Sequence, residues 1–181
     1  PNLEGVLDVV YNPARTQLLM DAEKRGIPTQ NGLWMLVAQA KESAEWFTQG
    51  QIPDSFIEKI YVMLRNQMEN LILIGMPGSG KSSVGRELAK LTGKTFLDAD
   101  ALIEEEAGNP IPEIFAENGE ETFRQLETKV LSQVGMNSGL VIATGGGCVT
   151  KARNYPLRHQ DGIIIWLRRD LEKLPTEGRP L

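Results

Sequence analysis

The sequence predicts an α/β protein in which helices flank a parallel sheet, and three observations carry that prediction. The second part of the chain contains short apolar runs of strand length, at residues 71–75, 95–100, 140–146 and 162–167. These runs are continuously apolar, which is typical of parallel strands covered on both faces. Amphipathic helical patterns separate the runs, so their order is that of βαβ units in an open sheet.

The helices between these strands have apolar faces that can be read directly. In the first helix, Val84, Leu88 and Leu91 share one face, and Gly93 is placed to end it. A longer face follows, formed by Phe123, Leu126, Val130, Leu131 and Val134. We expect both faces to pack on the sheet.

The first part of the chain has a different pattern. Residues 5–11 read as a short buried strand that Asn12-Pro13 ends. Thr16 is a candidate N-cap for a helix over residues 17–25, with Gly26 placed to stop it.

Two further helices are predicted before residue 70. Residues 32–47 place one face toward a core, and that face consists of Leu33, Leu36, Val37, Ala40, Ala44 and Phe47. Ser55 and Glu58 resemble a capping box that opens a helix reaching about residue 68. The predicted organisation is therefore a first region at 1–50, a linker and helix at 51–69, and a second domain at 70–181.

Composition excludes several classes of partner. The 181 residues are 41% hydrophobic and carry a net charge of -5, which gives no basic surface for nucleic acid or an anionic membrane. The single cysteine, Cys148, cannot form an internal disulfide, and no apolar run reaches the length of about 18 residues that a membrane span needs. No basic, apolar signal segment is visible, so the expected compartment is the cytoplasm.

The stretch GMPGSGKSS follows the first of the apolar runs and satisfies the pattern G-x-x-x-x-G-K-S. Its glycines let backbone N–H groups point inward, and a helix that begins near Lys81 adds its positive end. Lys81 can then reach nucleotide phosphates, while the Ser82 hydroxyl can bind Mg²⁺. The expected nucleotide-binding residues are Gly75, Met76, Pro77, Gly78, Ser79, Gly80, Lys81, Ser82 and Ser83. The alternative is a glycine turn with a solvated lysine.

Asp98 and Asp100 stand two residues apart at the end of a predicted strand, so both should point to one side of its carboxyl end. One carboxylate can support a Mg²⁺ ion, and the other can accept a proton from a substrate hydroxyl. The alternative is that Asp100 only caps the helix over residues 101–108.

Two more segments favour an anionic acceptor. Arg124 and Glu127 lie three residues apart on one helix face, where the glutamate could orient an arginine that binds a carboxylate. Gly145, Gly146 and Gly147 end a strand, where a ligand can approach the backbone. The alternative for Arg124 and Glu127 is a solvated surface pair, and the alternative for the three glycines is a plain turn. Together these features indicate a small anionic acceptor with hydroxyl groups.

The motifs GMPGSGKSS, FLDAD, IFAENGEETFRQLE, IATGGGCV and GRPL, in this order and spacing, resemble shikimate kinases over residues 70–181. The resemblance implies a P-loop fold like that of nucleoside kinases, ATP and Mg²⁺ as cofactors, and phosphorylation of the shikimate 3-hydroxyl. It implies that Asp98 assists the metal, that Asp100 is the base, and that Arg179 closes onto the transferring phosphate. The implied shikimate contacts are Asp100, Arg124, Gly145, Gly146 and Gly147.

Residues 8–26 and 31–40 resemble the C-terminal end of shikimate dehydrogenases, which would make the first region a mostly helical fragment of a Rossmann-like domain. The resemblance places Tyr11 beside the substrate pocket and implies that Gln39 contacts shikimate. NADP would be used only by the complete dehydrogenase. Because one enzyme makes shikimate and the other consumes it, the chain is expected to come from a bifunctional fusion.

The lid segment at residues 170–181 is short and lacks an arginine that many shikimate kinases have there. The chain also stops before segments with which the family continues. We therefore expect an internal piece of a longer polypeptide, with reduced kinase activity and no NADP-dependent oxidation of its own. The alternatives are an inactive nucleotide-binding module and a related kinase such as one for gluconate. The sequence leaves the oligomeric state open.

Overall fold

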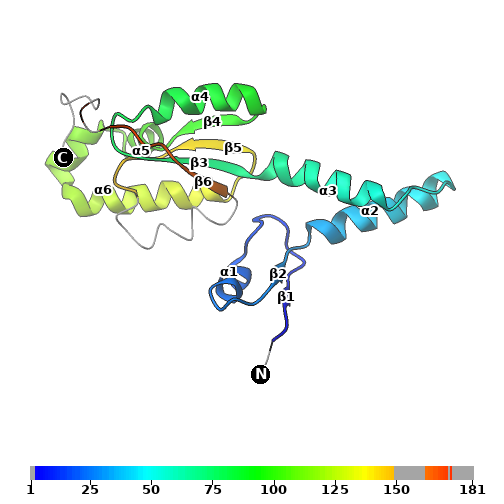
Figure 1. Cartoon of the computed structure of the whole chain (residues 1–181). Coiled ribbons are helices and arrows are strands. Elements are labelled where there is room, and N and C mark those ends of the chain that lie inside the picture. The colour runs from blue at the N-terminus through cyan, green and yellow to red at the C-terminus, as the bar shows by residue number, and fades with distance from the viewer. Residues whose placement is uncertain (1–2, 149–161, 171, 173–181) are drawn as a thin grey trace. The chain divides into compact units, whose positions relative to one another are not determined.

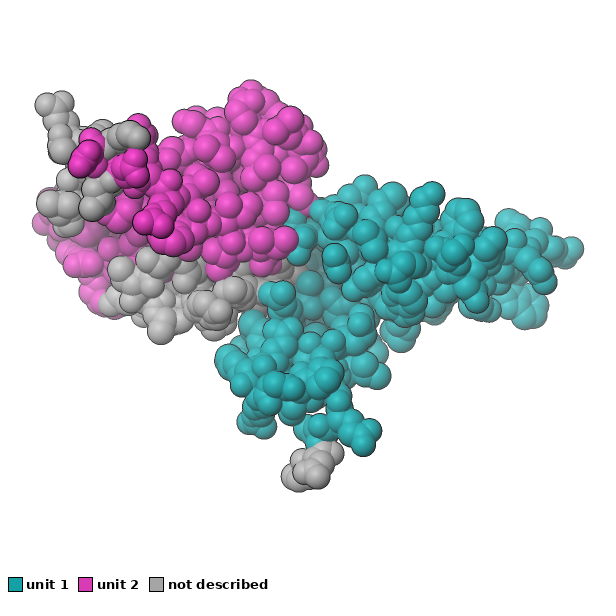
Figure 2. All heavy atoms as spheres, in the orientation of Figure 1, with its two compact units in different colours: residues 1–69 teal, residues 70–181 magenta. Residues whose placement is uncertain are grey.

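The computed structural model describes residues 3–148, 162–170 and 172. The chain divides into two compact units, Pro1–Glu69 and Asn70–Leu181, which Figure 2 shows in different colours. In the part of the chain that the structure describes, no helix has the length and apolarity to cross a bilayer.

Unit 2 is built on a four-stranded parallel sheet (Figure 1). Its strands are β3 (Asn70–Ile74), β4 (Thr95–Asp98), β5 (Leu140–Ala143) and β6 (Gly162–Trp166). Their order is β4-β5-β3-β6, and every neighbouring pair is parallel. The predicted α/β fold with a parallel sheet is confirmed.

Helices cover both faces of this sheet. On one face, Leu73 and Val141 pack with Ala89 of α4 (Lys81–Thr92). On the other face, Ile72 and Ile142 pack with α5 (Ala99–Ala107) and α6 (Ile111–Gly135). Successive residues of β3 and β5 thus enter two separate cores, which explains why these strands are apolar without alternation.

The predicted inner face of α4 is wrong in part. Gly85 and Ala89 are buried, whereas Val84 is exposed and Leu91 is 84% exposed. A Cβ atom at Gly85 would lie 2.5 Å from the Phe96 ring, so the missing side chain lets α4 approach β4 along this line. Close backbone packing at Gly85 therefore outweighs the burial of the larger side chains of Val84 and Leu91.

The long face of α6 is confirmed, because Phe123, Val130, Leu131 and Val134 are buried. The helix is kinked at Gly119, whose φ of 77° and ψ of 172° lie outside the helical region. A positive φ of this kind is one that glycine adopts without strain.

Unit 1 begins with a small parallel pair rather than with the predicted buried strand. β1 (Val6–Leu7) pairs with β2 (Thr29–Gln30), and the Leu7 side chain is 81% exposed. The prediction for residues 5–11 is therefore wrong in both length and burial. The Thr16 cap of α1 (Gln17–Glu23) is confirmed, since its side chain accepts a hydrogen bond from the Leu19 amide at 3.4 Å.

The other two helices of unit 1 are α2 (Leu33–Thr48) and α3 (Ser55–Met68). Of the face predicted for α2, Leu33 and Val37 are buried, but Phe47 is 90% exposed. No core therefore covers the end of that face among the described residues. The predicted capping box is also wrong, because the N-cap of α3 is Asp54 and its side chain makes no capping hydrogen bond.

Polar contacts join α2 to the start of α3. The Lys41 ammonium pairs with Glu45 at 3.1 Å and with Asp54 at 3.0 Å. The Glu45 carboxylate also accepts a hydrogen bond from the Ile52 amide, and this bond, with Lys41, lowers the pKa of the Glu45 carboxyl. Trp34 and Tyr61 add an edge-to-face contact between the two helices.

Candidate active site

The glycine-rich loop joins β3 to α4 in the order strand, loop, helix (Figure 1). Gly75, Gly78 and Gly80 have φ angles of 152°, 79° and 95°, a region that disfavours other residues. The Ser79 amide donates to the Met76 carbonyl at 3.1 Å, which closes a turn with Pro77 and Gly78 at its centre. Gly80 is the N-cap of α4 and has no side chain to cap it, so the helix offers its first amides to an anion.

The Lys81 side chain lies over this loop. Its ammonium donates to the Gly75 carbonyl at 2.8 Å and to the Met76 carbonyl at 3.0 Å. The predicted helix start at Lys81 is confirmed. A flexible cation held by neutral carbonyls can exchange them for phosphate oxygens.

The prediction that Asp98 and Asp100 lie together on an extended strand is wrong. β4 ends at Asp98, which is the N-cap of α5 and accepts a hydrogen bond from the Asp100 amide at 3.1 Å. Asp100 already belongs to the first turn of α5. The helix cap is therefore Asp98, and the alternative that Asp100 is only a cap is wrong. Aspartate strongly prefers the N-cap position, so α5 begins after Asp98 and β4 ends two residues before the predicted end at residue 100.

Two side-chain oxygen atoms beside the loop are suitable ligands for a magnesium ion. The Ser82 hydroxyl donates to the Asp98 carboxylate at 2.7 Å, so both oxygens lie at the start of α4. Mg²⁺ in nucleotide sites is held by one or two such protein oxygens together with phosphate oxygens and water. The donor set thus has the chemistry that the ion requires.

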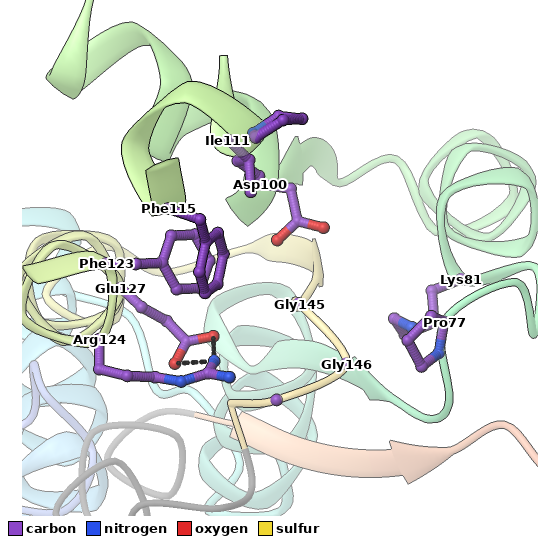
Figure 3. A pocket seen from close by; sticks show the side chains of 12 residues that line it. Pro77, Lys81, Asp100, Ile111, Phe115, Phe123, Arg124, Glu127, Gly145 and Gly146 are labelled. Carbon is purple, nitrogen blue, oxygen red and sulfur yellow. Dashed lines mark hydrogen bonds and ion pairs between the residues drawn. The ribbon is translucent and has the colours of Figure 1, made fainter. Parts of the chain in front are cut away.

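A pocket of about 300 Å³ opens next to the loop (Figure 3). Lys81 and Pro77 lie on one side of it, and Arg124 and Glu127 lie on the opposite side. The Asp100 carboxylate points into the space between them. The remaining lining residues are Ile111, Pro112, Phe115, Phe123, Gly145, Gly146 and Gly147. The structure therefore brings together residues from four of the predicted motif segments.

Arg124 and Glu127 form an ion pair in the pocket wall. The Arg124 Nη1 atom donates to both carboxylate oxygens of Glu127, at 3.3 Å and 3.2 Å, and Glu120 accepts from the Arg124 Nε atom at 3.3 Å. Glu127 is 1% exposed and Arg124 is 13% exposed. The alternative of a solvated surface pair is therefore wrong. A buried carboxylate needs its cation, so Glu127 restricts where the guanidinium can lie.

The three glycines after β5 allow this arrangement. A Cβ atom at Gly145 would lie 2.6 Å from the Asp100 Oδ1 atom, and one at Gly146 would lie 2.6 Å from Pro77. At Gly147 it would overlap the Arg124 guanidinium. The chain thus passes close to three site residues because it carries no side chains there.

Some site residues were not found by sequence reasoning. Phe115 and Phe123 pack with ring centroids 4.6 Å apart and form an apolar wall of the pocket, although Phe123 was assigned only to the core. Regular helical periodicity does not predict this contact, because the two rings meet across the kink at Gly119. Arg169, which follows β6, donates to the Gly78 carbonyl at 3.1 Å. No motif in the sequence indicates that contact.

The other predicted residues are not among those that line this pocket. Tyr11 and Gln39 both belong to unit 1, where their side chains are exposed. Arg179 lies outside the described residues. Cys148 is buried and donates to the Thr144 hydroxyl at 3.0 Å, as a packing residue does.

The parallel sheet, the glycine-rich loop and the following helix define a P-loop protein of the α/β class. Within that class, residues 77–177 match the family model of shikimate kinase, which covers more than half of the chain. The chain belongs to the shikimate kinase family.

Individual relatives agree with this assignment. A shikimate kinase of Prochlorococcus marinus is 52% identical over 105 residues, which cover 58% of this chain and 54% of that protein. A shikimate kinase of a Synechococcus species is 52% identical over 123 residues, covering 65% of this chain and 63% of that protein. The chain thus spans 54% and 63% of the length of these two curated relatives.

Solved structures give the same result. The shikimate kinase of Acinetobacter baumannii in complex with shikimate superimposes with a TM-score of 0.58 at 43% identity, covering 61% of this chain and 62% of that one. The shikimate kinase of Aquifex aeolicus superimposes with a TM-score of 0.54 at 33% identity, covering 57% and 65% of the two chains.

Proposed function

We propose that the protein containing unit 2 transfers the γ-phosphoryl group of ATP to the 3-hydroxyl of shikimate. The observation that carries this proposal is one pocket lined by Lys81 of the phosphate loop, by the Asp100 carboxylate and by the Arg124–Glu127 pair. A phosphate donor and an anionic acceptor can therefore meet in one cavity. The relative from Acinetobacter baumannii, solved in complex with shikimate, supports this choice of acceptor.

The donor side is assigned to the loop. Backbone N–H groups of residues 75–83, apart from Pro77, would surround the phosphates at the first turn of α4, and Lys81 would neutralise their charge. Ser82 and Asp98 would hold Mg²⁺, which neutralises charge on the phosphates during transfer. Family resemblance assigns Arg179 to the transferring phosphate.

The acceptor side is assigned to α5, α6 and the glycines after β5. Arg124 would bind the shikimate carboxylate through its guanidinium, which Glu127 holds in place. Phe115 and Phe123 would cover the apolar part of the ring. The backbone at Gly146 and Gly147 would lie within reach of the acceptor.

The reaction then follows from these positions. The shikimate 3-hydroxyl oxygen attacks the γ-phosphorus in line with the bond to ADP, and that bond breaks. Asp100 takes the hydroxyl proton as the new P–O bond forms. Lys81 stabilises the charge that spreads over the transferred group.

Acceptor identity can be tested with the full-length protein by measuring ADP release in the presence of MgATP. We expect turnover with shikimate and little with quinate or gluconate. Turnover with gluconate would favour a related small-molecule kinase. ATP binding without turnover on any acceptor would favour an inactive nucleotide-binding module.

Arg124 offers a second test of the acceptor site. In Arg124→Lys the charge beside buried Glu127 remains but the guanidinium fork is lost, so we expect the KM for shikimate to rise roughly tenfold or more. The KM for ATP should change less than about twofold, because the loop is untouched. Arg86→Lys, on the α4 side of the sheet, is the matched control. Equal changes in both KM values would remove Arg124 from the acceptor site.

We further propose that residues 1–50 belong to a shikimate dehydrogenase domain fused to the kinase, which would use NADP. Tyr11 would lie beside its substrate pocket and Gln39 would contact shikimate. The supporting observation is the unusual surface of unit 1, in which most large apolar side chains among residues 3–69 are exposed. They include Leu3, Leu7, Val9, Leu18, Trp34, Met35, Trp46, Phe47, Phe56 and Met63. Exposed apolar surface of this extent indicates that further polypeptide covers it.

The dehydrogenase proposal is tested by following NADPH formation from NADP⁺ and shikimate with the full-length protein. We expect this activity to persist in Lys81→Ala, because the two reactions would use separate sites. A full-length protein that phosphorylates shikimate but never reduces NADP⁺ would contradict the fusion.

A further inference from the structure

The end of β6 lies directly against the phosphate loop. Trp166 is paired with Ile74, and the Leu167 amide donates to the Ile74 carbonyl at 2.8 Å, one residue before the loop begins. A Cβ atom at Gly75 would lie 2.5 Å from the Leu167 carbonyl oxygen. The residues that follow β6 are therefore held at the side of the loop.

Two consecutive arginines at this point make different contacts. The Arg169 Nη1 atom donates to the Gly78 carbonyl at 3.1 Å. The Arg168 guanidinium lies over the Trp166 ring, 5.9 Å from its centroid. Of the pair, Arg169 is thus the residue with a hydrogen bond to the phosphate loop.

The Gly78 carbonyl belongs to the turn at the centre of the phosphate loop. Gly78 has a φ of 79° and lies in the turn closed by the Ser79 amide and the Met76 carbonyl. A carbonyl oxygen carries partial negative charge, which opposes the approach of a polyphosphate. A guanidinium bonded to it offsets that charge and fixes the turn.

We propose that Arg169 is a positioning residue of the nucleotide site, which braces the turn of the phosphate loop and adds positive charge at its rim. This proposal rests on the proposed kinase function, since it concerns the donor side of that reaction. The Arg169 side chain holds the Gly78 carbonyl and thereby affects nucleotide binding. It does not line the acceptor pocket and has no role there.

The test compares Arg169→Ala, Arg169→Lys and the matched control Arg168→Ala in the full-length protein. MgATP affinity is measured by calorimetric titration without acceptor, and both KM values are measured in the ADP-release assay. For Arg169→Ala we expect ATP affinity to fall by about tenfold, because a charge-assisted hydrogen bond at the loop is lost. The KM for shikimate and the thermal unfolding temperature should stay unchanged.

Lysine can donate one hydrogen bond and keeps the charge, so Arg169→Lys should recover most of the ATP affinity. Arg168→Ala should behave as the unaltered protein. Equal ATP affinities in Arg169→Ala and Arg168→Ala would overturn the proposal, and so would parallel increases in both KM values. If the unaltered protein binds ATP but phosphorylates no acceptor, the kinase function fails while the titration still decides the role of Arg169. A protein that does not bind ATP would overturn both.

Discussion

Lys81→Ala is expected to reduce phosphoryl transfer in the full-length protein by roughly 1000-fold or more, because the transferring group loses its nearest fixed cation. The Lys81 ammonium already lies over the loop, at 2.8 Å from the Gly75 carbonyl and 3.0 Å from that of Met76. It therefore needs only a small movement to reach a phosphate oxygen. MgATP binding should weaken in the same variant.

The matched control is Lys90→Ala on the same helix. Lys90 pairs with Glu87 at 2.8 Å in the last turn of α4, at the end opposite the loop. Its removal should leave both KM values and kcat unchanged. Near-normal ADP release by Lys81→Ala would contradict the assignment of the loop to ATP.

Asp100→Asn is expected to lower kcat by roughly 100-fold or more, since the amide has almost the same size but cannot take the hydroxyl proton. ATP affinity should change little. The cap of α5 is formed by Asp98, so the substitution leaves the start of that helix intact. Thermal unfolding should therefore be close to that of the unaltered protein.

Glu105→Gln provides a control on α5, because Glu105 is exposed and does not line the acceptor pocket. It removes one negative charge from the same helix without touching the site. If Asp100→Asn keeps most of its kcat while its acceptor KM rises, Asp100 binds the substrate but does not accept the proton.

Only part of the acceptor pocket could be predicted from the sequence. Arg124 and Glu127 were predicted to pair, but only the folded structure buries the glutamate and thereby fixes the arginine. Phe115 and Phe123 meet across a kink, and Arg169 reaches Gly78 from the end of another strand. The two rings meet only because the helix is kinked at Gly119, and Arg169 is 91 residues from Gly78, so no local pattern records these contacts.

The local predictions failed where the apolar pattern was outweighed by helix capping in one segment and by tertiary packing in another. The apolar run 95–100 suggested a strand through Asp100, but the capping preference of Asp98 began α5 instead. In α4, the periodicity of Val84, Leu88 and Leu91 suggested the inner face, yet Gly85 allowed closer packing against Phe96.

The sequence by itself determined the parallel α/β class and the phosphate loop, because these depend on short segments. Continuous apolar runs need cover on both faces, and the positive φ angles of Gly75, Gly78 and Gly80 are tolerated mainly by glycine. Only the tertiary structure decided that Asp100, Arg124 and Lys81 line one pocket. That convergence depends on the strand order β4-β5-β3-β6 and on the close approach allowed at Gly145 to Gly147, both of which arise from long-range packing.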